Sequence, residues 1–437
     1  MEWISQLIFV LVLALAGYFF ARRIFRIRAN ILMGRDLDRS DRVGERWKKM
    51  GLVAFGQQKM FKKPLVAFLH LLIYVGFLVI NIEVLEFVLD GLLGTHRFFA
   101  PYLGGYYSVA LNIFEFLALA VLISCAVFLI RRNVLKVDRF KKPEMKGWPY
   151  LDGNLILWIE MALMIAILKM NAADQLLQEL GTKGYPQTGT FYISSFLMKP
   201  FMTGFSAELL ILTERVAWWF HIAGILAFAV YVTYSKHLHI FLAFPNTYFS
   251  NLEPYGKISN MDAVTNEVKL MLGMSVDSSA SPEEVGRFGA KDATDLSWKS
   301  LMESYTCTEC GRCTAECPAN QTGKLLSPRK IMMDTRDRIE EIGNGMVEEK
   351  SLLGDYVSKE EINACTSCNA CTEACPINID PLSIILEMKR YVAMEESGAP
   401  TSWNSMFQNI ETNFAPWKFA PTDRFKWKEG LETQNPD

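Results

Sequence analysis

Two cysteine runs near the C-terminal end constrain this chain more than any other feature. The first run contains Cys307, Cys310, Cys313 and Cys317 followed by Pro318, and the second contains Cys365, Cys368, Cys371 and Cys375 followed by Pro376. Both follow the pattern C-x2-C-x2-C-x3-C-P. In this pattern three closely spaced thiolates hold one [4Fe–4S] cluster, and the fourth cysteine ligates the other cluster of a pair. The sequence therefore predicts two [4Fe–4S] clusters.

This rule of exchanged ligands divides the eight cysteines into two sets. The first cluster is assigned to Cys307, Cys310, Cys313 and Cys375. The second cluster is assigned to Cys365, Cys368, Cys371 and Cys317. Structural zinc sites and disulfides are the alternatives. A zinc site has no use for a third cysteine two residues after a CxxC pair, and disulfides are reduced in a cytosol, so the spacing favours clusters.

Apolar residues gather in the first 245 positions of a chain that is 51% hydrophobic. Five apolar runs are long enough to cross a hydrocarbon core of ~30 Å, at about 3–21, 64–90, 106–130, 151–170 and 208–239. The first run has no basic region before it and no cleavage site, which indicates an uncleaved membrane helix. A net charge of −2 gives no sign of a nucleic-acid partner.

Lysine and arginine are distributed unevenly among the segments between these runs. They are abundant after the first and third spans and scarce after the second and fourth. Since positively charged loops stay inside, the N-terminus is expected outside and the iron–sulfur region in the cytoplasm. We expect a multi-pass protein of a bacterial inner membrane.

Composition divides the chain into four parts, all mainly α-helical. Residues 1–245 form a membrane domain of five transmembrane helices, and residues 246–299 form a linker with one amphipathic helix. Residues 300–399 form a helical ferredoxin domain with two clusters. Residues 400–437 form a tail in which Trp403, Trp417 and Trp427 indicate docking on another protein surface.

Histidines inside a membrane are functional candidates, because ionisable side chains are unfavourable there. His221 and His239 are eighteen residues apart, which is five helical turns and ~27 Å, so we expect them on one face of the fifth span. His237 is expected to point elsewhere. His70 matches His239 in depth, and this pair is predicted to ligate an inner haem b. The alternative is a pair of polar side chains at a packed helix interface.

The membrane part also resembles known proteins. Five spans, a histidine early in the second and a histidine pair in the fifth resemble the gamma subunit of membrane-bound nitrate reductase, a dihaem cytochrome b that exchanges electrons with quinol. The segments Trp218–His221, Ser235–His239 and Phe244–Asn246 resemble heterodisulfide-reductase-like proteins, including electron-transfer-flavoprotein:menaquinone oxidoreductases. This resemblance implies a cytochrome b bundle fused to a helical di-cluster ferredoxin domain, with a (mena)quinone as substrate.

Two departures from these patterns modify the expectation. The nitrate-reductase pattern has a second histidine ten residues after the first, and Ile80 occupies that position here. One haem b is therefore expected, and His221 is a candidate ligand of a second haem without an evident partner. The fused relatives continue into a domain with two CCG repeats, which this sequence does not contain. We expect a separate CCG-type iron–sulfur or flavin-linked partner protein.

Together these features predict a membrane electron-transfer subunit of a quinone-dependent oxidoreductase complex. It would pass electrons between the quinone pool, haem b and two [4Fe–4S] clusters, and to or from a cytoplasmic partner. The sequence identifies no catalytic residue for substrate chemistry. The alternative is a redox-sensing or scaffolding protein without turnover. Two clusters favour the first interpretation, because successive centres are typical of electron transfer.

Overall fold

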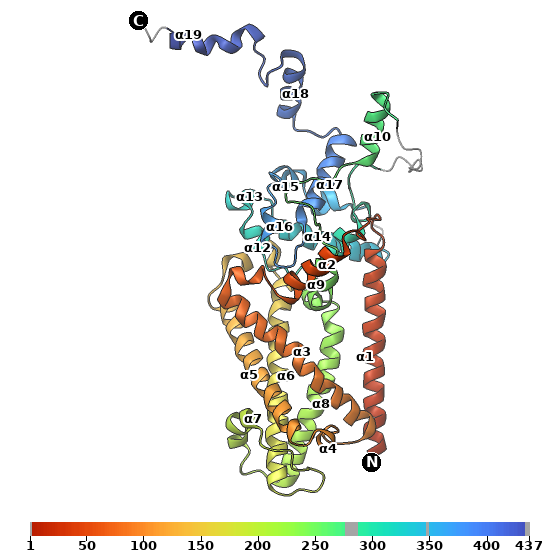
Figure 1. Ribbon diagram of the computed structural model, residues 1–437, viewed down its shortest axis with the longest axis vertical. Helices are drawn as coiled ribbons and strands as arrows, with labels where there is room; N and C mark the ends of the chain where they lie inside the picture. The colour runs from red at the N-terminus through yellow and green to blue at the C-terminus, as the bar shows by residue number, and fades with distance from the viewer. Residues whose placement is uncertain (1, 276–286, 347–348, 433–437) are drawn as a thin grey trace.

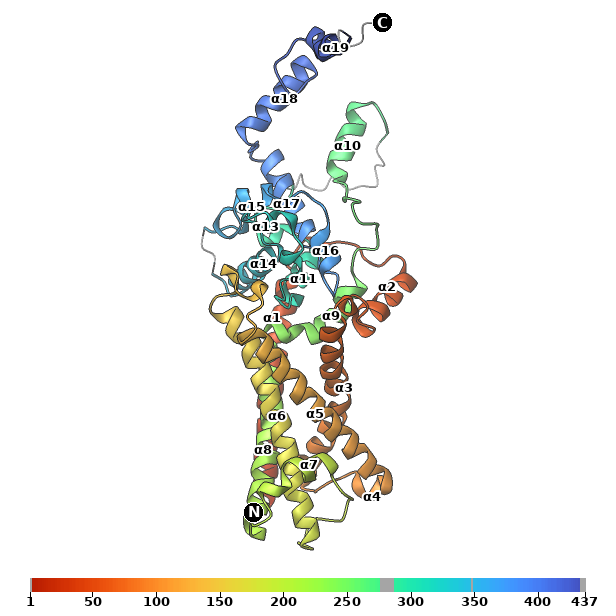
Figure 2. The same ribbon diagram turned by 90° about the vertical axis from the view of Figure 1, so that its left-hand side faces the viewer.

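The computed structural model describes residues 2–275, 287–346 and 349–432, and these residues are mainly helical. Figure 1 shows an elongated molecule with a bundle of long helices at one end. A compact domain of shorter helices sits on the bundle, and α18 and α19 project beyond it. The view turned by 90° in Figure 2 shows the same order of parts along the long axis.

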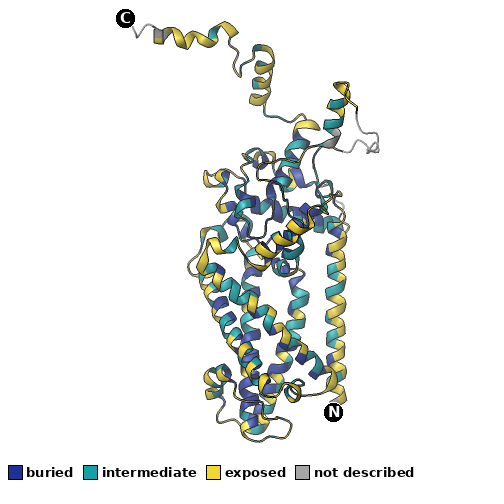
Figure 3. Cartoon of the chain, in the orientation of Figure 1, coloured by how far each residue is buried: buried dark blue, intermediate teal, exposed yellow. Residues whose placement is uncertain are grey.

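The five longest helices form the part that we call the membrane bundle. They are α1 (Glu2–Ile31), α3 (Pro64–Leu93), α5 (Gly105–Asn133), α6 (Trp148–Glu179) and α8 (Ala207–Val232). All five have the length and composition of membrane spans, as predicted. At ~1.5 Å per residue, even the shortest exceeds the hydrocarbon core of a bilayer. Apolar side chains of α1, such as Leu7 and Leu11, are exposed, as lipid-facing residues are. Figure 3 shows exposed positions along the whole of this helix.

The fifth span ends earlier than the sequence predicts. Helix α8 stops at Val232, and η6 (Lys236–Leu238) and α9 (His239–Tyr248) follow after a turn. The carboxylate of Asp152 accepts hydrogen bonds from the Ser235 hydroxyl, at 2.7 Å, and from the backbone N–H of Lys236, at 3.2 Å. In a continuing helix the Lys236 N–H would instead donate to a backbone carbonyl, so these side-chain bonds compete with the helix. The prediction that His221 and His239 share one helix face is therefore wrong.

Shorter helices connect these elements. They are α2 (Val43–Met50), η1 (Gly51–Phe55), η2 (Met60–Lys62), α4 (Ala100–Leu103), η3 (Asp138–Phe140), η4 (Pro143–Met145), α7 (Tyr192–Leu197) and η5 (Lys199–Phe201). Helix α10 (Asp262–Met271) is the predicted amphipathic helix. Residues 276–286 of the predicted linker lie outside the described residues.

The region with the cysteine runs forms a second helical unit, which we call the cluster domain. Its helices are η7 (Ala293–Asp295), α11 (Trp298–Thr306), α12 (Arg312–Ala315), α13 (Pro318–Gln321), α14 (Pro328–Gly343), η8 (Leu352–Tyr356), α15 (Lys359–Asn363), α16 (Ala370–Ala374) and α17 (Pro381–Met394). Ala290, Ala293 and Leu296 are buried in its core with Ile331 and Ile385. The domain therefore begins before residue 300, because these apolar side chains of the predicted linker complete its core.

Helix α1 joins the two units because it extends past the bundle into the cluster domain. Arg23 binds Glu340 of α14 through two hydrogen bonds of 2.7 and 2.9 Å. The side-chain amide of Asn30 donates to the Tyr305 hydroxyl at 2.8 Å, and Ile27 is buried in the core of the cluster domain. These contacts fix the cluster domain on one end of the bundle, which we call the cluster end.

The predicted tail forms α18 (Thr401–Asn413), η9 (Pro421–Phe425) and α19 (Lys426–Glu432). It extends away from the cluster domain (Figure 1). Its tryptophans Trp403, Trp417 and Trp427 are exposed.

Candidate functional site: two cysteine sets and a histidine cavity

The two cysteine runs fold into the same local structure. Glu309 and Gly311 have positive φ angles of 53° and 70° two and four residues after the first cysteine of their run. Ser367 and Asn369, with φ angles of 56° and 61°, occupy the same positions in the second run. A short helix follows in each case, α12 or α16, and these two helices pack against each other. The runs are thus two copies of one loop-and-helix motif.

The structure brings the first predicted cysteine set together. Cys307, Cys310, Cys313 and Cys375 line one small cavity between α12 and the loop after α16. Cys375 comes from the second run, 62 residues after Cys313, the last thiol of this set in the first run. The exchange of ligands between the runs, predicted from the sequence pattern, is therefore sterically available.

The second predicted set is also gathered, nearer the surface. Cys317 and Cys371 are buried, whereas Cys368 is exposed. Burial raises the pKa of Cys365, and the neighbouring thiols of Cys317 and Cys368 raise it further. The second set is thus the one that solvent or a partner protein reaches.

Several thiols of both sets are held in the protonated form unless a cation binds them. Burial, followed by the charges of neighbouring groups, raises the pKa of Cys307 and of Cys371 to about 12 and that of Cys375 to about 11. Backbone N–H groups point at the sulfurs: Glu309 N–H donates to Cys307 Sγ and Ser367 N–H to Cys365 Sγ, both at 3.4 Å. These sites fit cluster iron, which supplies the positive charge that thiolates require.

A larger cavity of about 340 Å³ lies where the membrane bundle meets the cluster domain. His70 from α3, His237 from η6 and His239 from α9 line it, and so does Cys310 of the first cysteine set. The sequence predicted the approach of His70 and His239. The prediction that His237 points elsewhere is wrong, because the turn after α8 brings it to the same cavity.

Hydrogen bonds fix one nitrogen of each predicted haem ligand. His70 Nδ1 lies 3.0 Å from Gln57 Oε1, and His239 Nδ1 lies 3.1 Å from the carbonyl oxygen of Lys236. An Nδ1–H that donates to an oxygen leaves Nε2 with its lone pair as the ligand atom. Both side chains would therefore be able to hold a haem iron through Nε2. His237 Nε2 instead lies 3.9 Å from Glu160 Oε1.

His221 lies apart from this cavity, deep in the apolar core of the bundle. Its Nδ1 lies 2.9 Å from the carbonyl oxygen of Leu163, and its ring packs 5.3 Å from the Phe87 ring. Ile80 is buried in the same core. His96 does not serve as its partner, because His96 Nε2 lies 3.4 Å from Asp174. The described residues therefore bring no second histidine to His221.

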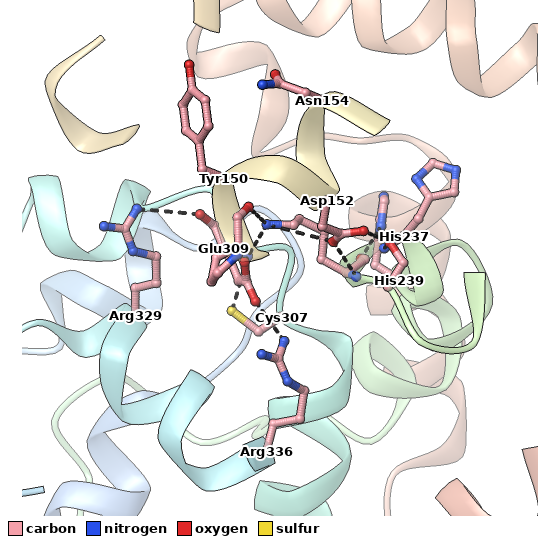
Figure 4. Close-up of polar contacts among 12 residues, drawn as sticks. Tyr150, Asp152, Asn154, His237, His239, Cys307, Glu309, Arg329 and Arg336 are labelled. Atoms are coloured by element: carbon pink, nitrogen blue, oxygen red, sulfur yellow. Dashed lines mark hydrogen bonds and ion pairs between the residues drawn. The ribbon is translucent and has the colours of Figure 1, made fainter. Parts of the chain in front are cut away.

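Charged side chains join the large cavity to the first cysteine set. Lys236, beside the histidines, is ion-paired with Glu309 of the first cysteine run. Glu309 also accepts a hydrogen bond of 2.7 Å from Arg336 of α14. Figure 4 shows Glu309 among Asp152, Arg336 and the segment that carries His237 and His239. This network locks the cysteine loop against the turn after α8.

Sequence reasoning missed Gln57 and the basic residues of the cavity wall. Gln57 is polar, buried and has a positive φ of 50° in the short segment after η1. The only sequence signal for it is a polar residue thirteen positions before an intramembrane histidine. Its contact with His70 depends on how the η1 segment folds back on α3.

Comparisons with known proteins agree with the cysteine sites. Residues 302–379 match the family model of the 4Fe-4S dicluster domain. The chain is 26% identical to a probable iron-sulfur-binding oxidoreductase, FadF, of Bacillus subtilis, over 97% of this chain and 61% of that protein. It is 26% identical to the EtfAB:quinone oxidoreductase of Syntrophomonas wolfei, over 98% of this chain and 59% of that protein.

A further relative is a probable membrane-anchored ferredoxin of Chromohalobacter salexigens, 27% identical over 33% of this chain and 24% of that protein. The chain spans about three fifths of the length of the first two relatives. No solved structure matches.

The fold and the cysteine sites thus define a class: an iron–sulfur electron-transfer protein with apolar helices of membrane-spanning length. More particularly, the chain carries a 4Fe-4S dicluster domain, and its relatives over nearly its whole length are iron–sulfur oxidoreductases.

Proposed function

We propose that this chain is a membrane electron-transfer subunit that connects the quinone pool with a soluble redox partner. Electrons pass between a (mena)quinone, haem b at the large cavity, the two clusters and the partner. The observation that carries this proposal is the shared wall: Cys310 lines both the small cavity of the first cysteine set and the large cavity with His70 and His239. Successive one-electron centres in such proximity are the arrangement that electron transfer requires.

The residues of the chain have defined tasks in this proposal. His70 and His239 hold the haem, with Gln57 and the Lys236 carbonyl orienting their rings. Haem and clusters supply the one-electron chemistry when bound. The lipid-facing surface of the bundle gives a lipophilic quinone access. The name of the Syntrophomonas wolfei relative, a quinone oxidoreductase, supports a quinone as substrate.

The order of the centres follows from exposure. The first cysteine set adjoins the large cavity, whereas Cys368 of the second set is exposed. A soluble partner, of the CCG type or linked to a flavin, therefore exchanges electrons with the second cluster. The tail offers the docking surface, because exposed tryptophans are enriched at interaction hot spots. Basic loops between the spans favour a cytoplasmic position for this surface, and hence a bacterial inner membrane with the N-terminus outside.

The bound haem is proposed for the His70–His239 pair alone. His221 stays a candidate ligand without a partner, because its ring packs against Phe87 and the position where the nitrate-reductase pattern has a second histidine is Ile80. The purified protein should show a low-spin b-type haem, and His70→Ala should remove it. His237→Ala should keep a low-spin spectrum. A wild-type protein without b-type haem would refute this part of the proposal.

The second candidate function is a redox sensor or scaffold without turnover, and one experiment separates the two. Wild-type protein in liposomes is mixed with a menaquinol analogue, and haem absorbance and cluster EPR signals are followed together. We expect haem reduction followed by cluster reduction, and reoxidation by an added soluble acceptor over many cycles. Clusters that report the ambient potential but do not turn over with quinol would favour the sensor.

A further inference from the structure

Four arginines line the wall of the large cavity. Arg132 donates hydrogen bonds to Asn154 Oδ1 and to the carbonyl oxygen of Tyr150, and the other three form what we call the arginine group. Arg131 lies at the cluster end of α5, Arg139 in η3, and Arg312 at the start of α12. Arg131 belongs to the membrane bundle, Arg139 to the connection between α5 and α6, and Arg312 to the cluster domain. The cavity wall is otherwise mostly apolar, with residues such as Ile73 and Phe128.

This arginine group has no carboxylate of its own among the described residues that line the cavity. The acids in that wall are Glu160 and Glu309. Glu309 is ion-paired with Lys236 and Arg336, and Glu160 faces His237. The positive charge of the arginines is therefore not balanced by side chains of the wall.

The arginines also repel one another. The Nε of Arg139 is buried and has no hydrogen-bond partner among the described residues. Burial and the like charges of Arg131 and Arg312 lower the pKa of Arg139. Three guanidinium groups in a mostly apolar wall are stable together when an anion lies between them, and their planar forks suit carboxylates.

We propose that the arginine group binds the two propionate carboxylates of the haem held by His70 and His239. This inference rests on the proposed function, which places a haem in the same cavity. A haem has an apolar macrocycle and two carboxylates on one edge. The macrocycle suits the apolar wall, and the carboxylates suit the cluster end of the bundle, where Arg131 and Arg139 mark the boundary of α5 and the polar loop after it.

The first cluster is the competing anion for these charges. A cube with four thiolates carries net negative charge, and Cys310 lies near enough to Arg139 to influence its pKa. If the arginines serve only this cluster, their loss changes the cluster and leaves haem binding unchanged. If they bind propionates, their loss weakens the binding of a haem with charged carboxylates more than the binding of a haem whose carboxylates are neutral.

The experiment compares protohaem with its dimethyl ester, in which both carboxylates are neutral. Full-length protein is produced in a haem-deficient host with its clusters assembled, and each haem is titrated in by absorbance. Wild type should bind protohaem at least about tenfold more tightly than the ester, equal to ~1.4 kcal/mol. Arg139→Gln should weaken protohaem binding and leave the ester nearly unaffected, so the preference shrinks.

Two further variants provide a second test and a control for the loss of one positive charge. Arg131→Gln repeats the test if Arg139→Gln assembles no clusters. Arg28→Gln removes the same charge from an exposed position at the cluster end of α1 and should keep the full preference. In resonance Raman spectra, Arg139→Gln should shift the propionate bending mode, which a change in cluster charge alone would leave in place.

The outcomes separate the two proposals. Equal binding of protohaem and ester by wild type overturns the propionate site while haem ligation stands. An unchanged preference in both arginine variants, with a shifted midpoint potential of the first cluster, overturns it in favour of a counter-charge for the cluster. If wild type forms no low-spin complex with either haem, the proposed haem function fails, and the propionate site fails with it.

Discussion

Cys375→Ala tests the exchange of ligands between the two cysteine runs. Cys375 belongs to the second run by sequence but lines the cavity of the first set with Cys307, Cys310 and Cys313. Its loss should therefore remove the first cluster and leave the second. The protein should fall from ~8 non-haem irons to ~4, with an equal loss of sulfide.

The structure indicates that the domain survives this substitution. Cys375 Sγ accepts a hydrogen bond of 3.3 Å from the N–H of Ile379. Removing one partly buried sulfur costs ~1–2 kcal/mol. This is less than the free energy of unfolding of a typical domain, ~5–15 kcal/mol. The four cysteines of the second set are unchanged by the substitution. The iron loss thus reports ligation and not unfolding.

The assay is iron and sulfide analysis of single and double variants. Cys375→Ala combined with Cys310→Ala should lose no more iron than either single variant, because both residues serve one cluster. Cys375→Ala combined with Cys368→Ala should lose nearly all of it. Cys125→Ala is the control, since Cys125 is buried in the membrane bundle.

The reverse pattern would refute the reasoning. In that case Cys375→Ala and Cys368→Ala would remove the same cluster, and Cys375→Ala combined with Cys310→Ala would abolish both. Each run would then hold its own cluster.

Three further predictions follow from the same contacts. Gln57→Leu removes the acceptor for His70 Nδ1 and should weaken haem binding by about 10–100-fold and raise the haem midpoint potential, as measured by absorbance titration and redox titration. Arg23→Gln breaks the paired hydrogen bonds to Glu340 and should destabilise the docking of the cluster domain by ~1–3 kcal/mol, measured as faster proteolysis between the two units with unchanged iron content. Truncation after Ala399 should abolish electron exchange with the native soluble partner but leave quinol-dependent cluster reduction intact, and an unchanged rate with that partner would contradict docking on the tail.

The sequence alone determined the features that depend on local spacing and composition. The cysteine pattern predicts two clusters, because three closely spaced thiolates of each run reach irons of one cluster and the fourth reaches the other, and the dicluster-domain match agrees. The five apolar runs predict five long helices, because a backbone in lipid must satisfy its own hydrogen bonds. The spacing of thiols is a local property of the chain and needs no tertiary information.

The tertiary structure decided where the histidines lie relative to one another. Helical periodicity predicted His221 and His239 on one helix face. Asp152 of α6, however, accepts hydrogen bonds from Ser235 and Lys236, and α8 ends before it reaches His239. The sequence around Ser235 does not predict these hydrogen bonds, because their acceptor, Asp152, lies on another helix.

The tertiary structure also decided which residues line the large cavity. Arg139 and Arg312 are far apart in the sequence and each occurs among other basic or cysteine-rich residues. They share one cavity because α1 fixes the cluster domain over the end of the bundle, through the contacts of Arg23 and Asn30. Long-range packing of two units, which no single stretch of sequence encodes, brings His70 and His239, the arginine group and the first cysteine set to one place.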